Sequence, residues 1–155
     1  MRHNLAIESI ARGVCVMDGW LLLCRRRSAS RSYLPGGHIE PGEGARTALR
    51  RELLEELGQP ANVGRFIGAL EHLFCDDHGK SVHEINLIFE VRMPRIHPDR
   101  PPVSAEEKIG FEWIRLSALP RSDLEPWPLR RRLRAWLGAA SSGWDSSIEP
   151  RGLGR

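Results

Sequence analysis

The sequence has few cysteines and lacks any long hydrophobic run. Its three cysteines, Cys15, Cys24 and Cys75, are odd in number and widely spaced, which favours free thiols in a reducing compartment over a disulfide framework. The longest purely apolar run, residues 20–24, is far shorter than the ~18 residues that span a membrane. The chain opens without a charged and then apolar leader, so we expect no cleaved signal and a cytoplasmic location.

Lysine is almost absent as well. Only Lys80 and Lys108 occur, so arginine supplies nearly all of the 23 basic side chains, and the net charge is +3. A mildly basic chain suits anionic small molecules, but this charge is too weak to indicate nucleic-acid binding by itself. We therefore expect a small anionic partner, no membrane partner and no nucleic-acid partner.

The 155 residues, 41% of them hydrophobic, fit one globular domain of ordinary size. Apolar periodicity and turn residues predict five strands and two helices, namely strands at residues 9–17, 20–25, 65–75, 82–93 and 111–116 and helices at residues 45–57 and 128–137. Residues 36–44 and 94–108 are predicted loops. A Gly/Ser-rich C-terminal tail, residues 138–155, is predicted to follow a domain of residues 1–137. Strands mixed with a few helices indicate an α/β or α+β sandwich.

Three glutamates on the predicted helix 45–57 are the main candidates for chemistry. Glu52, Glu55 and Glu56 stand at i, i+3 and i+4, so all three share one helix face. Like charges at this spacing repel by about 0.2–0.5 kcal/mol per pair, and a cation on that face would offset the repulsion. Carboxylates on a rigid element suit Mg²⁺ or Mn²⁺, ions that also hold substrate phosphates. The spacing therefore predicts a divalent-metal site; the alternative is an ordinary solvated acidic face.

The glycine-rich segment before this helix fits the same site. Gly36 and Gly37 let the backbone approach a ligand closely, and Gly37 can offer its carbonyl to the ion. The N-terminus of the helix presents free N–H groups toward the same region. Arg51 adjoins Glu52 and reaches toward Glu43, so we expect it to orient the acids.

The spacing of these residues resembles the signature of the MutT/Nudix hydrolase family. The matching positions are Gly37, Glu43, Arg51, Glu52, Leu53, Glu55, Glu56 and Gly58. Eight fixed positions within 22 residues make the resemblance specific, and it extends over about residues 8–137. The last signature position is usually aliphatic, whereas this chain has Gln59, a departure that we expect to affect only packing.

The resemblance implies a three-layer α/β/α sandwich with a mixed β-sheet, and an enzyme that hydrolyses a nucleoside diphosphate linked to another group X. It implies that the signature glutamates bind Mg²⁺ or Mn²⁺ and that an acid outside the signature assists. Glu107, six residues before Trp113, is our candidate for that acid. Arg26 lies where relatives often carry a phosphate-contacting arginine. The predicted catalytic residues are Glu52, Glu55, Glu56, Glu107 and Arg51, the metal ligands Gly37, Glu52, Glu55 and Glu56, and the substrate-binding residues Arg26, Gly36, Gly37 and Glu43.

Several alternatives stay open. Glu107 fits an ordinary exposed loop acid as well as a catalytic one. The Arg-rich helix 128–137 could bind RNA, although such a run more often forms a solvated helix face. A zinc site could be formed by His72, Cys75, His78 and His83. The spacing of these residues matches no common zinc motif. The alternative function is a Nudix-fold nucleotide-binding or regulatory module without turnover, against which the intact acids argue.

Two features of the predicted strands have more than one interpretation. Tyr33 and Phe74 could stack on a base, although packing in the core or at an edge is the default for aromatic side chains. Residues 83–87 look like a strand edge that faces either the substrate or a second copy in a homodimer.

Overall fold

The computed structural model describes residues 5–148 and divides them into short and long strands, two α-helices and one 3-10 helix. The strands are β1 (Ile7–Val14), β2 (Val16–Met17), β3 (Trp20–Arg26), β4 (Ser32–Tyr33), β5 (Gly36–His38), β6 (Asn62–Cys75), β7 (Ser81–Arg92), β8 (Ile109–Arg115), β9 (Leu124–Glu125) and β10 (Gly143–Ser146). The helices are α1 (Ala45–Leu57), α2 (Leu129–Gly138) and the 3-10 helix η1 (Leu116–Arg121). No helix within residues 5–148 is long and apolar enough to cross a membrane.

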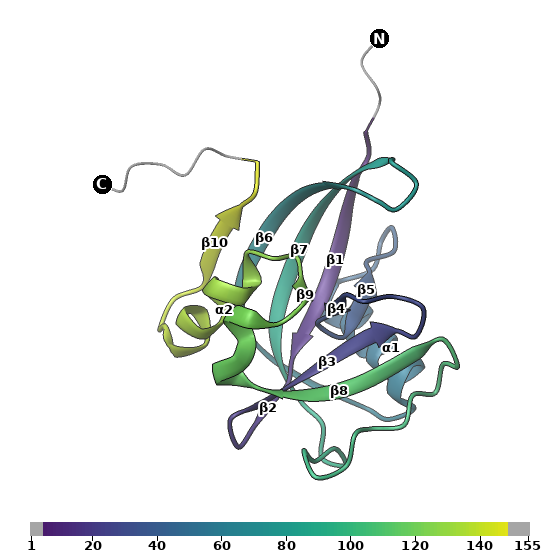
Figure 1. Ribbon diagram of the computed structural model, residues 1–155, viewed down its shortest axis with the longest axis vertical. Coiled ribbons are helices and arrows are strands. Elements are labelled where there is room, and N and C mark those ends of the chain that lie inside the picture. Colours follow the sequence, from purple (N-terminus) through teal and green to yellow (C-terminus); the bar gives the residue numbers. More distant parts are fainter. Residues whose placement is uncertain (1–4, 149–155) are drawn as a thin grey trace.

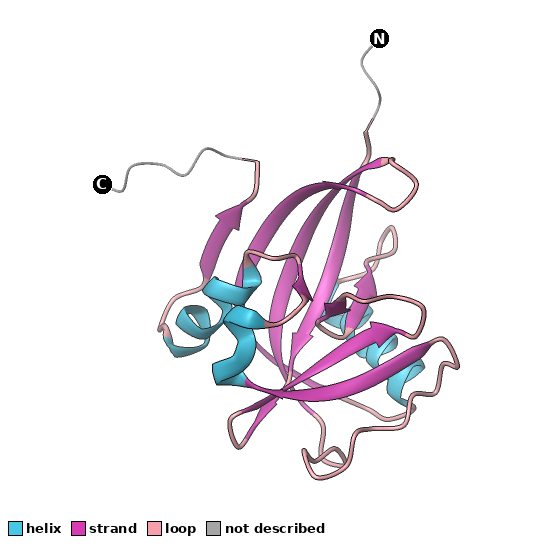
Figure 2. Cartoon of the chain, viewed as in Figure 1, coloured by secondary structure: helices cyan, strands magenta, loops and turns pink. Residues whose placement is uncertain are grey.

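The strands form two mixed sheets, where the sequence led us to expect one. The first sheet has the order β10-β6-β7-β1-β5, with β1 parallel to β7 and β6 antiparallel to β7. The second sheet has the order β2-β3-β4-β9, and β8 pairs with β3. Figure 2 shows β3 and β8 crossing below the long strands of the first sheet. The α/β class is confirmed, with the sheet divided in two.

Helices cover both faces of the first sheet, so the three-layer arrangement is confirmed (Figure 1). Leu49 and Leu53 of α1 pack with Ala11 and Phe89 in one buried cluster. Leu129, Leu133 and Trp136 of α2 pack in a second buried cluster with side chains from the sheets, among them Leu21, Leu23, Ile67, Leu70 and Ile88. The first cluster holds α1, which carries the acids, against one face of the sheet, and the second cluster holds α2.

Helix α1 has the bounds that the sequence predicts. It follows Gly44 and stops at Gly58, which adopts the left-handed conformation at φ 66°. The Gly58 N–H bonds the Leu54 carbonyl at 2.8 Å and closes the last turn. Leu49, Leu53 and the end residue Leu57 are buried and fix the rotation of the helix.

Two segments that the sequence predicted as loop and tail contain strands. Gly36–His38, predicted as loop, forms β5 and pairs antiparallel with β1, because Gly36 at φ 130° lies so close to the Ala11 carbonyl that a Cβ would overlap it. Within the predicted tail, β10 pairs parallel with β6, because Gly143 leaves room for the Trp136 indole. The rest of the predicted tail, residues 149–155, lies outside the described residues.

The prediction that residues 83–87 form a strand edge is wrong. They belong to β7, which is hydrogen-bonded to β6 on one side and to β1 on the other. Glu84 and Asn86 lie on one face of this interior strand, because alternate residues of a strand face the same side.

Candidate active site

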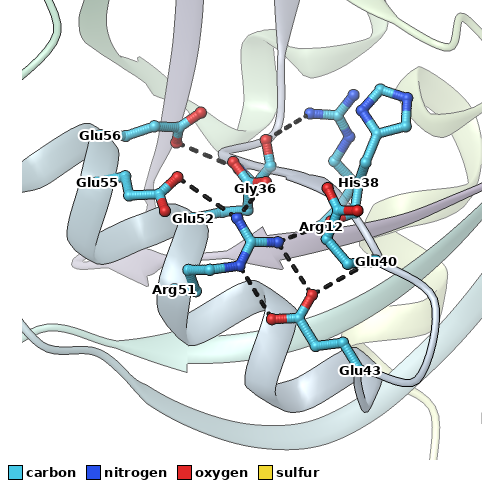
Figure 3. A network of polar contacts seen from close by, with 9 residues as sticks. All are labelled: Arg12, Gly36, His38, Glu40, Glu43, Arg51, Glu52, Glu55 and Glu56. Carbon is cyan, nitrogen blue, oxygen red and sulfur yellow. Dashed lines mark hydrogen bonds and ion pairs between the residues drawn. The ribbon is translucent and has the colours of Figure 1, made fainter.

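Three glutamates on α1 lie beside strand β5, and their exposure differs (Figure 3). Glu56 is buried, with 5% of its surface exposed, whereas the side chains of Glu52 and Glu55 are 19% and 51% exposed. The i, i+3, i+4 spacing thus brings the acids together on one face, as predicted. Their exposure to solvent increases from Glu56 to Glu52 to Glu55.

Arg51 binds the acids around it and the loop that precedes the helix. Its guanidinium donates to both carboxylate oxygens of Glu43, at 2.9 and 3.0 Å, and to Oε1 of Glu52 at 2.9 Å. It also reaches the His38 carbonyl at 3.1 Å and Glu55 at 3.4 Å. The hydrogen bond from Arg51 lowers the pKa of Glu43 below its usual value. The expected reach of Arg51 toward Glu43 is therefore present, and the pair ties the loop to the helix.

Gly36 and Gly37 bring the backbone of β5 close to the acids of α1. The backbone N–H of Gly36 donates to Oε2 of Glu56 at 3.3 Å. At Gly37 a Cβ would overlap the carboxylate of Glu52, so only glycine leaves room for that carboxylate against the strand. Backbone and carboxylate oxygens therefore crowd together at the junction of β5 and α1.

Burial raises the pKa of Glu56 to about 7. The positive charge of Arg12 and the Gly36 N–H oppose this effect, while the charges of Glu52 and Glu106 add to it. A cation close to this buried carboxylate would stabilise its charged form and lower its pKa.

Arg12 belongs to the site, and sequence reasoning missed it. Its guanidinium donates to the carbonyls of Leu34 and Gly36, at 3.1 and 3.2 Å, and to Oδ1 of Asn86 at 3.4 Å. These bonds hold β5 in place from the side opposite α1 (Figure 3). A charged residue inside an otherwise apolar predicted strand was the signal that could have found it.

The loop of residues 94–108 contacts the C-terminal half of α1. The Ala105 N–H bonds the Glu56 carbonyl at 2.7 Å, and the Ser104 hydroxyl reaches the same oxygen at 3.3 Å. Glu106, the next residue, acts on Glu56 through its charge. Glu106 and Glu107 are both exposed and line a surface pocket with Arg26, Arg27 and Lys108. The structure thus brings Glu107 and Arg26 together, and it places the neighbouring acid Glu106 within electrostatic reach of the buried glutamate.

Two of the four candidate zinc ligands, His72 and His83, have side-chain contacts of other kinds. Nδ1 of His72 lies 3.0 Å from the Ser147 hydroxyl, and Nε2 of His83 lies 3.0 Å from Glu71. In the Arg-rich helix α2, Arg130 bonds Glu125 at 2.8 Å and Arg132 bonds Asp145 at 2.8 Å. Both groups of residues therefore take part in local structure.

The α1 acids match a hard divalent cation by their chemistry. Across residues 5–148, no group of three or more His, Cys, Asp or Glu side chains stands preassembled for a metal ion. Around α1, the guanidinium of Arg51 occupies oxygens of Glu52 and Glu55. The carboxylates of Glu52, Glu55 and the strongly desolvated Glu56, with the backbone of Gly37, offer the oxygen donors that Mg²⁺ requires. The chemistry of these oxygens therefore fits the ion.

Comparison with known proteins identifies the family. The NUDIX domain matches residues 8–137, so the chain belongs to this family and is an enzyme of the Nudix hydrolase class. It is 32% identical over 143 residues to an isopentenyl-diphosphate Delta-isomerase of Rhodobacter capsulatus, covering 87% of this chain and 78% of that protein. It is 30% identical over 135 residues to the nucleoside triphosphatase NudI of Klebsiella pneumoniae, covering 80% and 90% of the two chains.

Solved structures agree with the fold. The solution structure of the E. coli ORF135 protein has a TM-score of 0.62 and 25% identity, and the match covers 90% of this chain and 97% of that chain. The MutT protein from Methanosarcina mazei Go1 has a TM-score of 0.68 at 19% identity, over 86% and 95%. The MutT/Nudix resemblance and the sandwich fold are therefore confirmed.

Proposed function

We propose that the protein is a Mg²⁺-dependent pyrophosphohydrolase, with Mn²⁺ as a substitute ion, that acts on a nucleoside diphosphate derivative or a nucleotide. Water cleaves the phosphoanhydride bond, so a nucleoside diphosphate linked to X gives a nucleoside monophosphate and X-phosphate. A triphosphate gives the monophosphate and pyrophosphate. The observation that carries this proposal is the junction of β5 and α1, where Glu52 lies against Gly37 and Glu56 meets the Gly36 N–H.

The residues of the site have different proposed roles, which depend on their positions. Glu52, Glu55, Glu56 and the carbonyl of Gly37 would hold the ion, which when bound supplies positive charge to the phosphate oxygens and acidifies water. Arg51 and Glu43 keep the loop and helix in register through their paired hydrogen bonds. Arg26 lies in a pocket with Arg27 and Lys108, whose cationic side chains suit a phosphate, and with the acids Glu106 and Glu107.

The proton of the attacking water needs an acceptor. A glutamate of α1, Glu106 or Glu107 can take it, since each carries a carboxylate near the site. Both loop acids are exposed and line the same pocket as Arg26. Of the two we favour Glu106, because its charge acts on Glu56.

The fold and the named relatives support this function and the partner it requires. A nucleoside triphosphatase and a putative 8-oxo-dGTP diphosphatase of Bacillus subtilis are among the similar proteins, the latter 31% identical over 64% of this chain and 60% of its own length. The three cysteines are free thiols, which suits the cytoplasm. A module that binds nucleotides without turnover remains the competing function.

A panel of nucleoside triphosphates, nucleoside diphosphate sugars and dinucleoside polyphosphates with Mg²⁺ tests the proposal. Chromatography should show a monophosphate product from at least one class, and EDTA should abolish it. Isopentenyl diphosphate belongs in the panel, because one relative is named as its isomerase. Isomerisation of that compound with no nucleotide cleaved would overturn the proposal, and binding without any cleavage would favour the inactive module.

A further inference from the structure

Two adjoining grooves lie at the end of the molecule where the β2 hairpin approaches the loop between β7 and β8 (Figure 1). The first, which we call the loop groove, has a volume of about 730 Å³ and is lined mainly by residues 94–103. The second, the strand groove, has a volume of about 430 Å³ and is lined by β2 and by the ends of β6 and β7 where they pair. Met17 and Pro94 line both grooves, so the two meet.

Both grooves lie outside the catalytic junction. The described residues that line them include no glutamate of α1, no glycine of β5 and not Arg26. The chain leaves the loop groove at Val103 and only then reaches Ser104 and Ala105, which bond the Glu56 carbonyl. A ligand of these grooves would therefore occupy a site other than the one proposed for the nucleotide.

The strand groove is mainly apolar. Cys15, Val91 and Met93 line it and are only 2%, 3% and 2% exposed. Val16 lines it too and is 39% exposed, so apolar surface in this groove is in contact with water. Removing such surface from water is favourable. The strand groove therefore suits a hydrocarbon chain.

The loop groove carries cationic side chains that have no partners. Arg95 and Arg100 are exposed, and within residues 5–148 neither guanidinium has an ion-pair partner. The acid of this groove, Asp99, lies 3.1 Å from Nδ1 of His97. Guanidinium groups bind phosphate oxygens through pairs of parallel hydrogen bonds. Two of them in one groove suit a doubly charged phosphate better than a neutral head group.

Gln59 adds a polar group to the loop groove. It lines this groove and directly follows Gly58, at the position where the Nudix signature usually has an aliphatic residue. Its Oε1 is buried and accepts no hydrogen bond from the described part of the chain. A buried amide oxygen without a donor is unfavourable. A ligand hydroxyl toward which the amide turned would remove this unfavourable state.

We propose that the two grooves form one binding site for a soluble, single-chain phosphate monoester, with the phosphate held by Arg95 and Arg100 and the hydrocarbon chain in the strand groove. A hydroxyl group near the phosphate would donate to Gln59. The proposal does not rest on the proposed function, since it uses none of the residues assigned to hydrolysis. A membrane surface fits less well, because most of the apolar lining is recessed and nearly buried.

Calorimetry in EDTA, with ligands below their critical micelle concentrations, tests the proposal. Octyl phosphate should bind at least about tenfold more tightly than inorganic phosphate, a gain that burial of two methylene groups would already supply. 1-Octanol keeps the chain without the phosphate and should bind at least about tenfold more weakly than octyl phosphate. Equal affinity for octyl phosphate and inorganic phosphate would overturn the proposal. Binding to phosphatidic acid vesicles without binding of octyl phosphate would overturn it as well.

Arginine variants locate the phosphate. The double variant Arg95→Gln, Arg100→Gln should bind octyl phosphate at least about tenfold more weakly than the wild type. The matched control Arg121→Gln, Arg134→Gln removes two exposed arginines that line neither groove, and its affinity should equal that of the wild type. Loss of octyl phosphate binding in Arg26→Gln but not in the first double variant would place the ligand in the catalytic pocket and overturn the proposal.

The strand groove and Gln59 have tests of their own. Val16→Glu places a charge in the strand groove, so its affinity for octyl phosphate should fall to within about threefold of that for inorganic phosphate. An unchanged affinity would show that the chain does not lie there. The wild type should bind 2-hydroxyoctyl phosphate at least about threefold more tightly than octyl phosphate, whereas Gln59→Leu should bind both equally, because leucine cannot accept from the hydroxyl. Equal affinity of the wild type for these two ligands would overturn the role of Gln59. Thermal melts check that each variant folds.

Discussion

The backbone N–H of Gly36 donates to the Glu56 carboxylate at 3.3 Å, and this contact joins the short strand β5 to helix α1. Glu56 is buried there, and burial raises its pKa to about 7. The contact therefore holds the Glu56 carboxyl group where its charged form is unfavourable unless a cation is near. Two predictions follow from the charge and burial of this group.

The stability of the metal-free protein should fall as the pH rises. The pKa of Glu56 is about 7 in the folded protein and 4.5 in its unperturbed state, so the folded protein binds this proton more tightly. Its contribution to stability is complete below about pH 4.5 and is lost as the pH rises through about 7, a loss of roughly 3 kcal/mol. Urea unfolding in EDTA at several pH values measures this loss in the free energy of unfolding.

Glu56→Gln is the control for the pH dependence, because it removes the titrating group and keeps its size. The variant should lose less free energy of unfolding than the wild type between pH 5 and pH 8. Identical pH profiles for the two proteins would show that Glu56 does not titrate in this range.

Magnesium should stabilise the fold. At ten times the dissociation constant, binding to the folded state alone adds about 1.4 kcal/mol, or a few degrees in Tm. Differential scanning fluorimetry with MgCl₂, against KCl of equal ionic strength, detects the shift. Full nucleotide hydrolysis in excess EDTA would contradict a metal-dependent reaction.

Gly37→Ala should impair activity more than stability. The new Cβ would overlap the Glu52 carboxylate and push it from the site, so kcat should fall at least about tenfold. Gly110→Ala is the matched control, because a Cβ at Gly110 meets nothing within 4 Å. Steady-state kinetics and thermal melts of both variants separate the two effects, and an active Gly37→Ala enzyme would rule out a tight approach at this glycine.

The two loop acids should respond differently to removal of their charge. Glu106 acts on Glu56 electrostatically, so Glu106→Gln should lower kcat at least about tenfold with little change in KM. Glu107 is not among the main charges that act on Glu56, so Glu107→Gln should change kcat by no more than about twofold. The kcat and KM of both variants show which acid assists the reaction. A larger loss of kcat in Glu107→Gln than in Glu106→Gln would make Glu107 the proton acceptor.

The local features of the site could be predicted from the sequence, because they depend on short spacings. Helix α1 ends where Gly58 permits the left-handed conformation, and its three acids share a face by helix periodicity alone. The same spacing indicated that Arg51 reaches Glu43, eight residues away.

The features that were missed depend on contacts between distant segments. Strand β5 exists because Gly36 packs against Ala11, and β10 exists because Gly143 packs against Trp136. Arg12 joins the site only through this pairing. A single sequence shows the glycines but not their partners, so loop and tail were the natural predictions.

The central claim is that the α1 glutamates hold the ion that drives phosphoanhydride cleavage, and Glu56→Gln tests it most directly. The measurement is kcat on the best nucleotide of the panel, with saturating Mg²⁺, for the wild type and the variant, each checked for folding by its thermal melt. We predict that the variant folds and that its kcat is lower by roughly 10²-fold or more, because the activation barrier rises by several kcal/mol. A variant that kept more than about a tenth of the wild-type kcat, a barrier change under ~1.4 kcal/mol, would contradict the account.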